Sequence, residues 1–168
     1  MLDLIKGRPG PDLQDPHLAL VADSRGLVVL KEIAVWWRAF AVDNHCVLTS
    51  RLLKKLQVFD QCVEWFYRSQ NVSPYNELAG EQFLLEMSRH TEPLVRAVAQ
   101  FELALHRVKQ GDASEYCIIW DRDPAEVCDS LTSVDEIPLP GPKDLYHTYI
   151  SRNIPGLVRC QLVSESEP

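Results

Sequence analysis

The chain has 168 residues, a length that suits one ordinary domain or two small lobes that share a core. Hydrophobic residues make up 46% and charged residues 24%, as in soluble globular proteins, and no apolar run approaches the length of a membrane span. The formal net charge is −7, and it is unevenly placed: residues 112–168 hold 11 acidic and 4 basic side chains, whereas residues 1–111 hold 13 of each. This acidity disfavours binding to nucleic acid or anionic lipid. The N-terminus lacks the long apolar core of a secretory signal, so we expect a cytoplasmic protein.

The first part of the chain predicts a flexible arm and then a bundle of helices. Residues 1–25 contain several proline and glycine residues and are expected to form the arm. The strongly apolar stretch after it predicts a helix over about 28–41. A second helix is expected to start after Thr49 or Ser50, either of which is a suitable N-cap.

The second helix has a regular apolar pattern. Its hydrophobic residues are spaced alternately by four and three, which predicts one continuous stripe on a helix of about five turns. The stripe consists of Leu52, Leu56, Phe59, Val63 and Phe66.

A third helix is expected to start at Ser73 or Pro74 and to contain Gly80, which costs about 1 kcal/mol relative to alanine inside a helix.

The fourth helix has the clearest boundaries. Thr91 is expected to cap it, Pro93 lies in its first turn, and Gly111 is a suitable residue for its C-terminal end. Because the apolar faces of these helices are too wide for isolated helices, residues 26–111 are predicted to pack as a bundle.

After Gly111 the pattern predicts a small β-α-β-β lobe over residues 112–163. Residues 114–121 are rich in strand-forming residues, and Asp123 and Pro124 are expected to start a short helix. Because this lobe is too small to build a core alone, it should pack against the bundle. The predicted fold class is therefore α+β.

The lobe is predicted to end in a hairpin. Residues 136–142 are expected to be an irregular linker, and two alternating runs, 144–151 and 157–163, flank the turn sequence Arg-Asn-Ile-Pro-Gly. Residues 164–168 are expected to be a disordered tail.

Known catalytic and metal-binding motifs are missing from the sequence. It has no nucleophile elbow, no phosphate-binding glycine loop and no metal-binding spacing among its histidines or its five cysteines. The cysteines are expected to be small buried hydrophobes in a reducing compartment. Glu102 and His106 share one helix face; they form either an acid–base pair or, in the interpretation we favour, a capping or interhelical hydrogen bond.

Aromatic residues indicate a surface for a protein partner. Neighbouring residues of a helix cannot all face inward, so part of each aromatic group should be exposed, and exposed aromatic side chains often anchor interfaces. The candidates for a partner interface are Trp36, Trp37, Trp65 and Tyr67.

A basic cluster, Arg51, Lys54 and Lys55, is the one candidate for contact with nucleic acid. It is more typical of the solvated face of a helix, which is the interpretation we favour.

The C-terminal hairpin has two interpretations. A small sheet with a free edge can accept another chain as an added strand, which makes the lobe a peptide-docking element. In the other interpretation, the hairpin only packs over the helical bundle, and the sequence pattern supports both interpretations about equally.

Two stretches resemble a known family. GEQFLLEMSRHTEPLVRAVAQFELALHRV, residues 80–108, is similar to a run in the HvfC-like family, with an E-x-F opening, a proline after a polar break and a helix of the form AxFExALxR. IIWDRDPAEVCDSL followed by YISRNIPGLV resembles the C-terminal part of related accessory proteins, in which a DPxxVxxxL helix precedes a hairpin. Together these stretches cover roughly half of the chain.

The resemblance implies a non-catalytic role. Members of this family accompany multinuclear non-haem iron oxidative enzymes, which are TIM barrels that modify ribosomally made peptides, as in methanobactin and 3-thiaglutamate biosynthesis. The barrel enzyme holds the iron and acts on a cysteine of the precursor, and the small partner forms a heterodimer with it and holds the leader of the precursor peptide. This implies no cofactor in the present chain and no binding to nucleic acid or membrane.

We therefore expect the docking strand at Leu145–Arg152, with Arg152 and Arg159 pairing with acidic side chains of the peptide. The expected peptide contacts are Leu145, Tyr146, His147, Thr148, Tyr149, Ile150, Arg152 and Arg159. The alternative is a nucleic-acid-binding regulatory protein that uses the helix around Arg51–Lys55, and a third hypothesis is a small enzyme that uses Glu102 and His106.

Overall fold

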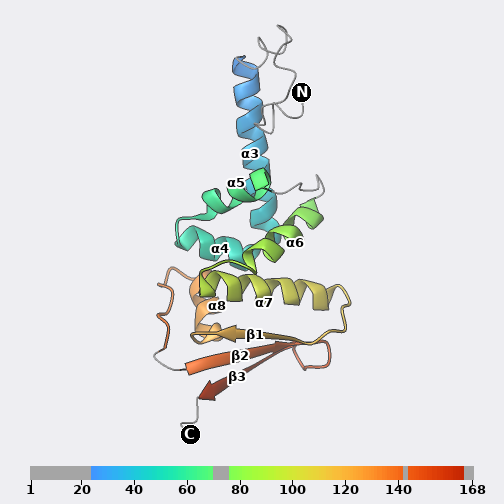
Figure 1. The fold of residues 1–168 in the computed structure, drawn as a ribbon, viewed down its shortest axis with the longest axis vertical. Helices are drawn as coiled ribbons and strands as arrows, with labels where there is room; N and C mark the ends of the chain where they lie inside the picture. Colours follow the sequence, from blue (N-terminus) through green and yellow to red (C-terminus); the bar gives the residue numbers. More distant parts are fainter. Residues whose placement is uncertain (1–23, 70–75, 142–143, 165–168) are drawn as a thin grey trace.

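The computed structural model describes residues 24–69, 76–141 and 144–164. Within these ranges, five helices are followed by a three-stranded antiparallel sheet that a sixth helix interrupts, so the predicted α+β class is confirmed (Figure 1). Most of the predicted arm (1–25) and of the predicted tail (164–168) lies outside the described residues; Arg25 already belongs to the first helix and Ser164 to the last strand.

Helix α3 spans Arg25–His45 and extends the predicted helix at both ends. Ser24 caps its start, since the Ser24 hydroxyl accepts a hydrogen bond from the Leu27 N–H at 3.2 Å. The C-terminal half of α3 packs against the other helices, whereas its N-terminal half projects beyond them (Figure 1). Among the described residues, no helix combines the length and the apolar character that a membrane span requires.

The predicted five-turn second helix is wrong. The structure has two helices there, α4 at Val47–Lys55 and α5 at Phe59–Ser69, and the predicted caps Thr49 and Ser50 lie inside α4. Between the helices, Gln57 adopts a left-handed conformation with φ 59°. The Gln57 N–H donates to the Lys54 carbonyl and the Val58 N–H to the Leu53 carbonyl, which is the Schellman pattern that ends a helix.

This break changes the predicted apolar stripe. Leu52, Phe59, Val63 and Phe66 are buried as expected, but Leu56 lies at the turn and is 39% exposed. The two shorter helices therefore share one apolar core without forming one continuous cylinder.

Helix α6 spans Asn76–Met87 and passes very close to the end of α3. Gly80 makes this approach possible, because a Cβ atom added there would lie only 2.0 Å from Cδ2 of His45. The predicted start at Ser73 or Pro74 lies outside the described residues.

Helix α7 spans Pro93–Lys109, and Pro93 lies in its first turn as predicted, at the first helical position. Its N-cap is Glu92 and not the predicted Thr91. Gly111, at φ 112°, ends the helix with the same Schellman bonds, from its own N–H to Val108 and from the Asp112 N–H to Arg107.

The C-terminal lobe has the predicted β-α-β-β order. Strand β1 is Tyr116–Trp120, helix α8 is Pro124–Thr132, and the hairpin strands are β2 at Asp144–Ile150 and β3 at Val158–Ser164. The Asp123 carboxylate caps α8 by accepting from the Ala125 N–H. The sheet order is β1-β2-β3, with Thr148 opposite both Ile118 and Cys160.

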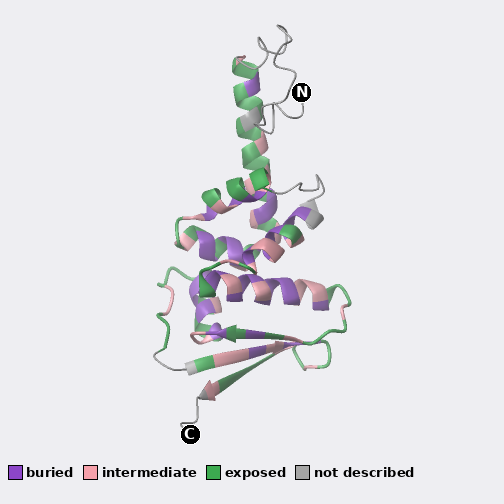
Figure 2. Ribbon diagram, viewed as in Figure 1, coloured by how far each residue is buried: buried purple, intermediate pink, exposed green. Residues whose placement is uncertain are grey.

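Bundle and lobe share one hydrophobic core. Helix α7 lies between α4 and α6 on one side and the sheet on the other, and it is buried along most of its length (Figure 2). The rings of Phe101 on α7 and Trp120 on β1 meet edge to face with centroids 5.7 Å apart. The lobe therefore obtains much of its apolar contact from the bundle, as its small size requires.

Candidate functional site

The most conspicuous surface of the described chain is an apolar stripe on α3. Five large hydrophobic side chains recur at helical spacing on one side of this helix. They are Val29, Ile33, Trp36, Trp37 and Phe40, which we call the α3 stripe. Each is exposed, from 44% at Phe40 to 58% at Trp36. A helix that leaves such a stripe in water usually has a binding partner.

The α3 stripe leads into a pocket at the foot of the helix. This pocket has a volume of about 470 Å³ and lies between α3 and the turn that joins α4 to α5. Trp36 and Phe40 form an aromatic wall, and Asp43, Lys54 and Asp60 supply charges. The remaining lining residues are Ala39, Gln57 and Phe59.

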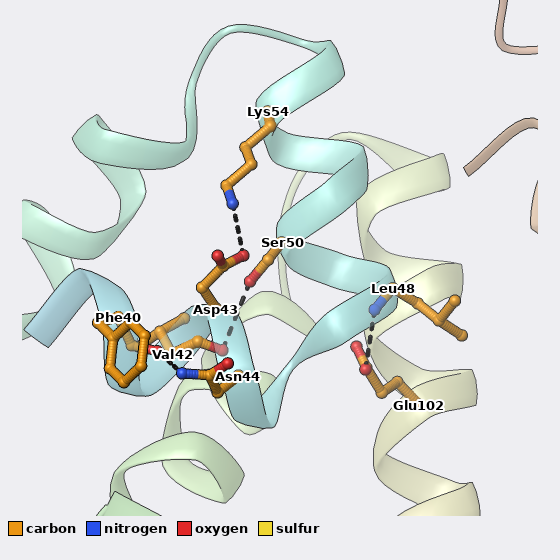
Figure 3. A network of polar contacts seen from close by, with 8 residues as sticks. All are labelled: Phe40, Val42, Asp43, Asn44, Leu48, Ser50, Lys54 and Glu102. Carbon is orange, nitrogen blue, oxygen red and sulfur yellow. Dashed lines mark hydrogen bonds and ion pairs between the residues drawn. The ribbon is translucent and has the colours of Figure 1, made fainter. Parts of the chain in front are cut away.

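Lys54 already occupies part of this pocket. Its ammonium group lies 2.6 Å from the Asp43 carboxylate (Figure 3). It also lies 5.1 Å above the centroid of the Phe59 ring. A carboxylate and an aromatic face together hold a cation well, although half-exposed ion pairs contribute little to stability. The left-handed turn at Gln57 shapes this side of the pocket, because it directs the chain from Lys54 back to Phe59.

The predicted interface residues divide into two groups. Trp36, Trp37 and Trp65 are exposed, at 58%, 54% and 51%, and are accessible to a partner. Tyr67 is only half-buried, but it packs against Phe66 and lies beneath the guanidinium of Arg38, and burial raises the pKa of its hydroxyl. The role of these four residues in an interface stays a prediction.

The sequence interpretation missed the remaining members of the stripe and most of the pocket. Val29, Ile33 and Phe40 were not singled out, although the stretch GLVVLKEIAVWWRAFAVD carries apolar residues on every helical face. That excess was the available signal, because one helix cannot bury all of its faces against one bundle.

The predicted peptide-docking strand is not a sheet edge. Strand β2, which contains Leu145 to Ile150, lies between β1 and β3 and pairs with both of them. Its backbone groups are used by two neighbours, so the prediction that residues 145–152 accept an added strand is wrong. The sequence pattern of a hairpin does not show which of its two strands a third strand will pair with. In this structure β1 pairs with β2.

The side chains of β2 point to two different faces. Thr148 and Ile150 are fully buried against the helices, and the half-buried Tyr146 shares their face, so the first two are not available as peptide contacts. Leu145, His147 and Tyr149 lie on the opposite face, which is not covered by helices (Figure 1).

The two predicted arginines have different surroundings. Arg159 on β3 is exposed, and its guanidinium lies 5.3 Å over the ring of Tyr149 on the open face. Arg152 lies in the hairpin turn and donates to the Gly111 carbonyl at 3.3 Å, so it ties the hairpin to the end of α7.

In the described part of the chain, β1 and β3 are the edge strands of the sheet. Strand β3 is the more accessible edge, because Arg159, Cys160, Gln161 and Leu162 are all exposed. Although Cys160 and Leu162 face the same way as buried Thr148, α7 packs on β1 and β2 and leaves them uncovered.

Glu102 is a capping residue. Its buried carboxylate accepts hydrogen bonds of 2.9 Å from the N–H groups of Leu48 and Thr49, in the first turn of α4, and Figure 3 shows the bond from Leu48. Burial raises its pKa, and the two N–H bonds oppose that rise only in part. The favoured structural interpretation of Glu102 is confirmed: a side chain of α7 caps a neighbouring helix.

His106 lies apart from this contact. Its ring meets the ring of His45 edge to face, with centroids 4.8 Å apart, and burial lowers its pKa. No hydrogen bond joins Glu102 to His106 in the described part of the chain, and no group of three or more potential metal ligands is found there.

Two residues of the basic cluster are engaged within the chain. Lys54 pairs with Asp43, and Lys55 donates to the carbonyls of Ser133 and Asp135 at 3.2 and 2.6 Å, which ties α4 to the loop after α8. Arg51 is exposed. These contacts favour a structural role for the cluster.

The five cysteines are all unpaired, but they are not all buried. Cys46 lies in the core, where burial raises the pKa of its thiol strongly, and Cys62 and Cys128 are partly buried. Cys117 and Cys160 are exposed on the sheet, which corrects the prediction for these two.

Comparison with known proteins leaves the family assignment a prediction. No model of a protein family, no curated protein and no solved structure matches the chain. The sequence resemblance therefore remains an expectation, and the surfaces described above carry the functional argument.

Proposed function

We propose that this chain is a non-catalytic partner subunit that forms a heterodimer with an iron-dependent TIM-barrel enzyme and binds the leader of a ribosomally made precursor peptide. The observation that carries the proposal is the α3 stripe, in which five large apolar side chains remain uncovered. From Val29 to Phe40 it extends roughly 17 Å along the helix, at 1.5 Å per residue.

The composition of the stripe supports a protein partner. Tryptophan is among the residues that contribute most to binding when they become buried in an interface, and Trp36 and Trp37 lie side by side with ring centroids 5.1 Å apart. Val29 and Ile33, both exposed, extend the stripe into the N-terminal half of α3. This half projects beyond the other helices and is largely coloured as exposed (Figure 2). We place the α3 stripe against the barrel enzyme, and the iron in that enzyme.

The peptide is placed on the sheet lobe, at the edge of β3. An added strand there finds unpaired backbone groups, the uncovered side chains of Cys160 and Leu162, and the guanidinium of Arg159 for an acidic side chain. We place the complex in the cytoplasm, where all five cysteines remain as thiols, as they are in the structure.

The first test is directed at the α3 stripe. Ile33→Asp puts a charge at the centre of the stripe and outside the pocket, and it is expected to weaken the complex with the barrel enzyme about 30-fold or more, as for a hot-spot residue. Calorimetry of the two purified proteins, together with light scattering for a one-to-one complex, measures the effect.

Val134→Asp is the matched control, because Val134 is a fully exposed apolar residue in the loop after α8. It should leave the affinity unchanged. An Ile33→Asp complex as tight as that of the original chain, or a chain that binds no barrel enzyme when the two are produced together, would contradict the proposed partner role.

The second test is directed at the β3 edge. Arg159→Glu reverses the charge next to Tyr149, and it is expected to weaken binding of an acidic leader peptide about fivefold, the range of an exposed ion pair. Fluorescence anisotropy of a labelled precursor peptide encoded beside this chain gives the affinity.

Arg68→Glu on α5 is the control for this second test. Arg68 is exposed and pairs with its neighbour Glu64 on the same helix. Its replacement by glutamate produces the same change in net charge far from the sheet. Equal losses in both variants would show a general charge effect and count against β3.

A further inference from the structure

We infer that the pocket at the foot of α3 receives a guanidinium group, namely the side chain of an arginine on the partner protein. This inference rests on the proposed use of α3 as an interface and adds the chemistry of one contact within it. The pocket opens beside the α3 stripe, since Trp36 and Phe40 belong to both.

The aromatic wall of the pocket suits a flat cation. The rings of Trp36 and Phe40 are stacked, with centroids 5.2 Å apart and an interplanar angle of 13°, and Trp37 meets both rings edge to face. Both stacked rings are about half exposed. The electron-rich face of such a ring attracts a cation, and a planar guanidinium stacks on it more fully than an ammonium group.

The charges in the pocket leave one carboxylate for a ligand. Of the two lining carboxylates, Asp43 is paired with Lys54 at 2.6 Å, and Asp60 has no ion pair with any described residue. Asp60 lies in the first turn of α5, and it contributes the second negative charge of the pocket. A cation bound between Asp60 and the aromatic wall would bring the charges of the pocket into balance.

The pocket already contains the same combination once. The Lys54 ammonium pairs with the Asp43 carboxylate and lies over the Phe59 ring, so one cation contacts both a carboxylate and an aromatic face. The pocket also contains a second carboxylate, that of Asp60, and a second aromatic surface, formed by Trp36 and Phe40. No cation of the described chain pairs with this carboxylate.

Other classes of ligand fit less well. An anion would meet two carboxylates and find a single ammonium that is already paired. A purely apolar side chain would remove Asp60 from water without giving it a partner, which is unfavourable. An arginine supplies both the charge and the flat surface, and it donates up to five hydrogen bonds to the carboxylates.

The test uses the complete chain and a small probe. The probe is the capped tripeptide Gly-Arg-Gly, and the control probe replaces its arginine by citrulline, which has nearly the same shape but no charge. Two-dimensional NMR follows the indole N–H signals of the four tryptophans during titration. We expect the arginine probe to shift the signals of Trp36 and Trp37, and the citrulline probe to bind at least several-fold more weakly.

Two variants localise the site. Asp60→Asn is expected to weaken binding of the arginine probe about fivefold, as for the loss of an exposed ion pair. Glu64→Gln removes one negative charge from the same helix outside the pocket and should change nothing, because Glu64 pairs with Arg68.

Three results would overturn the inference: equal affinity for the two probes, shifts that spare Trp36, or an unchanged affinity in Asp60→Asn. If the signals of Trp36 and Trp37 shift with protein concentration alone, the occupant is a second copy of this chain and the inference also fails. Ile33→Asp alters the α3 stripe and leaves the pocket unchanged, whereas Asp60→Asn alters the pocket and leaves the stripe unchanged. The two variants therefore test the partner role and the arginine contact separately.

Discussion

Replacing Glu102 with alanine is expected to lower the free energy of unfolding by about 3 kcal/mol, because two helix N–H groups would lose their acceptor in a buried place. The N–H groups of Leu48 and Thr49 point at this carboxylate, and the N-cap of α4, Cys46, makes no side-chain capping bond of its own. Urea denaturation followed by circular dichroism measures the loss. Ser88→Ala is a comparison, since the Ser88 hydroxyl donates to the carbonyl of Leu85 in the last turn of the preceding helix, and its effect should be much smaller.

The pH dependence of Glu102→Gln gives a second check on this cap. Burial raises the pKa of Glu102 above its ordinary value of 4.5, so the folded protein holds this proton more tightly than the unfolded chain does. That contribution to stability is fully present below pH 4.5 and is lost as pH rises through the folded pKa. The free energy of unfolding of the original chain, relative to that of the glutamine variant, should therefore fall as pH rises. A difference that grows instead would mean that the two N–H bonds outweigh burial.

Replacing Gly80 with alanine is expected to lower the free energy of unfolding by about 2 to 3 kcal/mol, although alanine favours a helix intrinsically. The new methyl group would lie 2.0 Å from Cδ2 and 2.7 Å from Cβ of His45. Because Cβ is fixed to the backbone of α3, rotation of the imidazole cannot relieve the overlap, and the two helices must separate. Thermal and urea unfolding measure the change.

Gly26→Ala is the matched control for Gly80. Gly26 is also helical, but among the described residues an added Cβ there meets nothing closer than the Ser24 hydroxyl at 4.0 Å. Its replacement should be neutral or stabilising by up to about 1 kcal/mol. Adding His45→Ala to Gly80→Ala should recover part of the loss, since contacting residues are coupled. Equal stability of the two glycine variants would show that α3 and α6 do not approach as closely as described.

The end of a helix could be predicted where the residue at that position is of a type common at helix ends. Gly111 and Gln57 end α7 and α4 with the same hydrogen-bond pattern and the same left-handed backbone. Glycine at such a position is common, so the end of α7 was visible in the sequence. Glutamine there is uncommon, and the apolar spacing of four and three continues through the break. The pattern therefore predicted one helix, and the left-handed turn that forms one side of the pocket was missed.

The order of the strands in the sheet could not be predicted from the alternating sequence pattern, for a different reason. Alternation between residues 144 and 163 indicated the hairpin, but β1 could pair with the outer edge of either hairpin strand, and the alternation does not distinguish the two edges. The position of β1 is decided by the packing of Trp120 and Ile118 against α7, which is a tertiary effect. The same argument applies to Glu102, whose role as a cap depends on how α7 lies beside α4.

Helix α3 consists of two parts that differ in what keeps them folded. Near His45, the close approach at Gly80 and the core around Val42 couple the backbone to the folding of the whole bundle. Along Val28 to Val35, many side chains are exposed, and within the described part of the chain the helix depends largely on its own hydrogen bonds. An isolated segment of this length is only marginally helical in water. Amide protons should therefore exchange by local opening in the projecting half and by global unfolding near the foot. Binding of a partner to the stripe would then consolidate helix that the free chain holds weakly, so part of the binding energy is used for ordering and the affinity should fall steeply on heating.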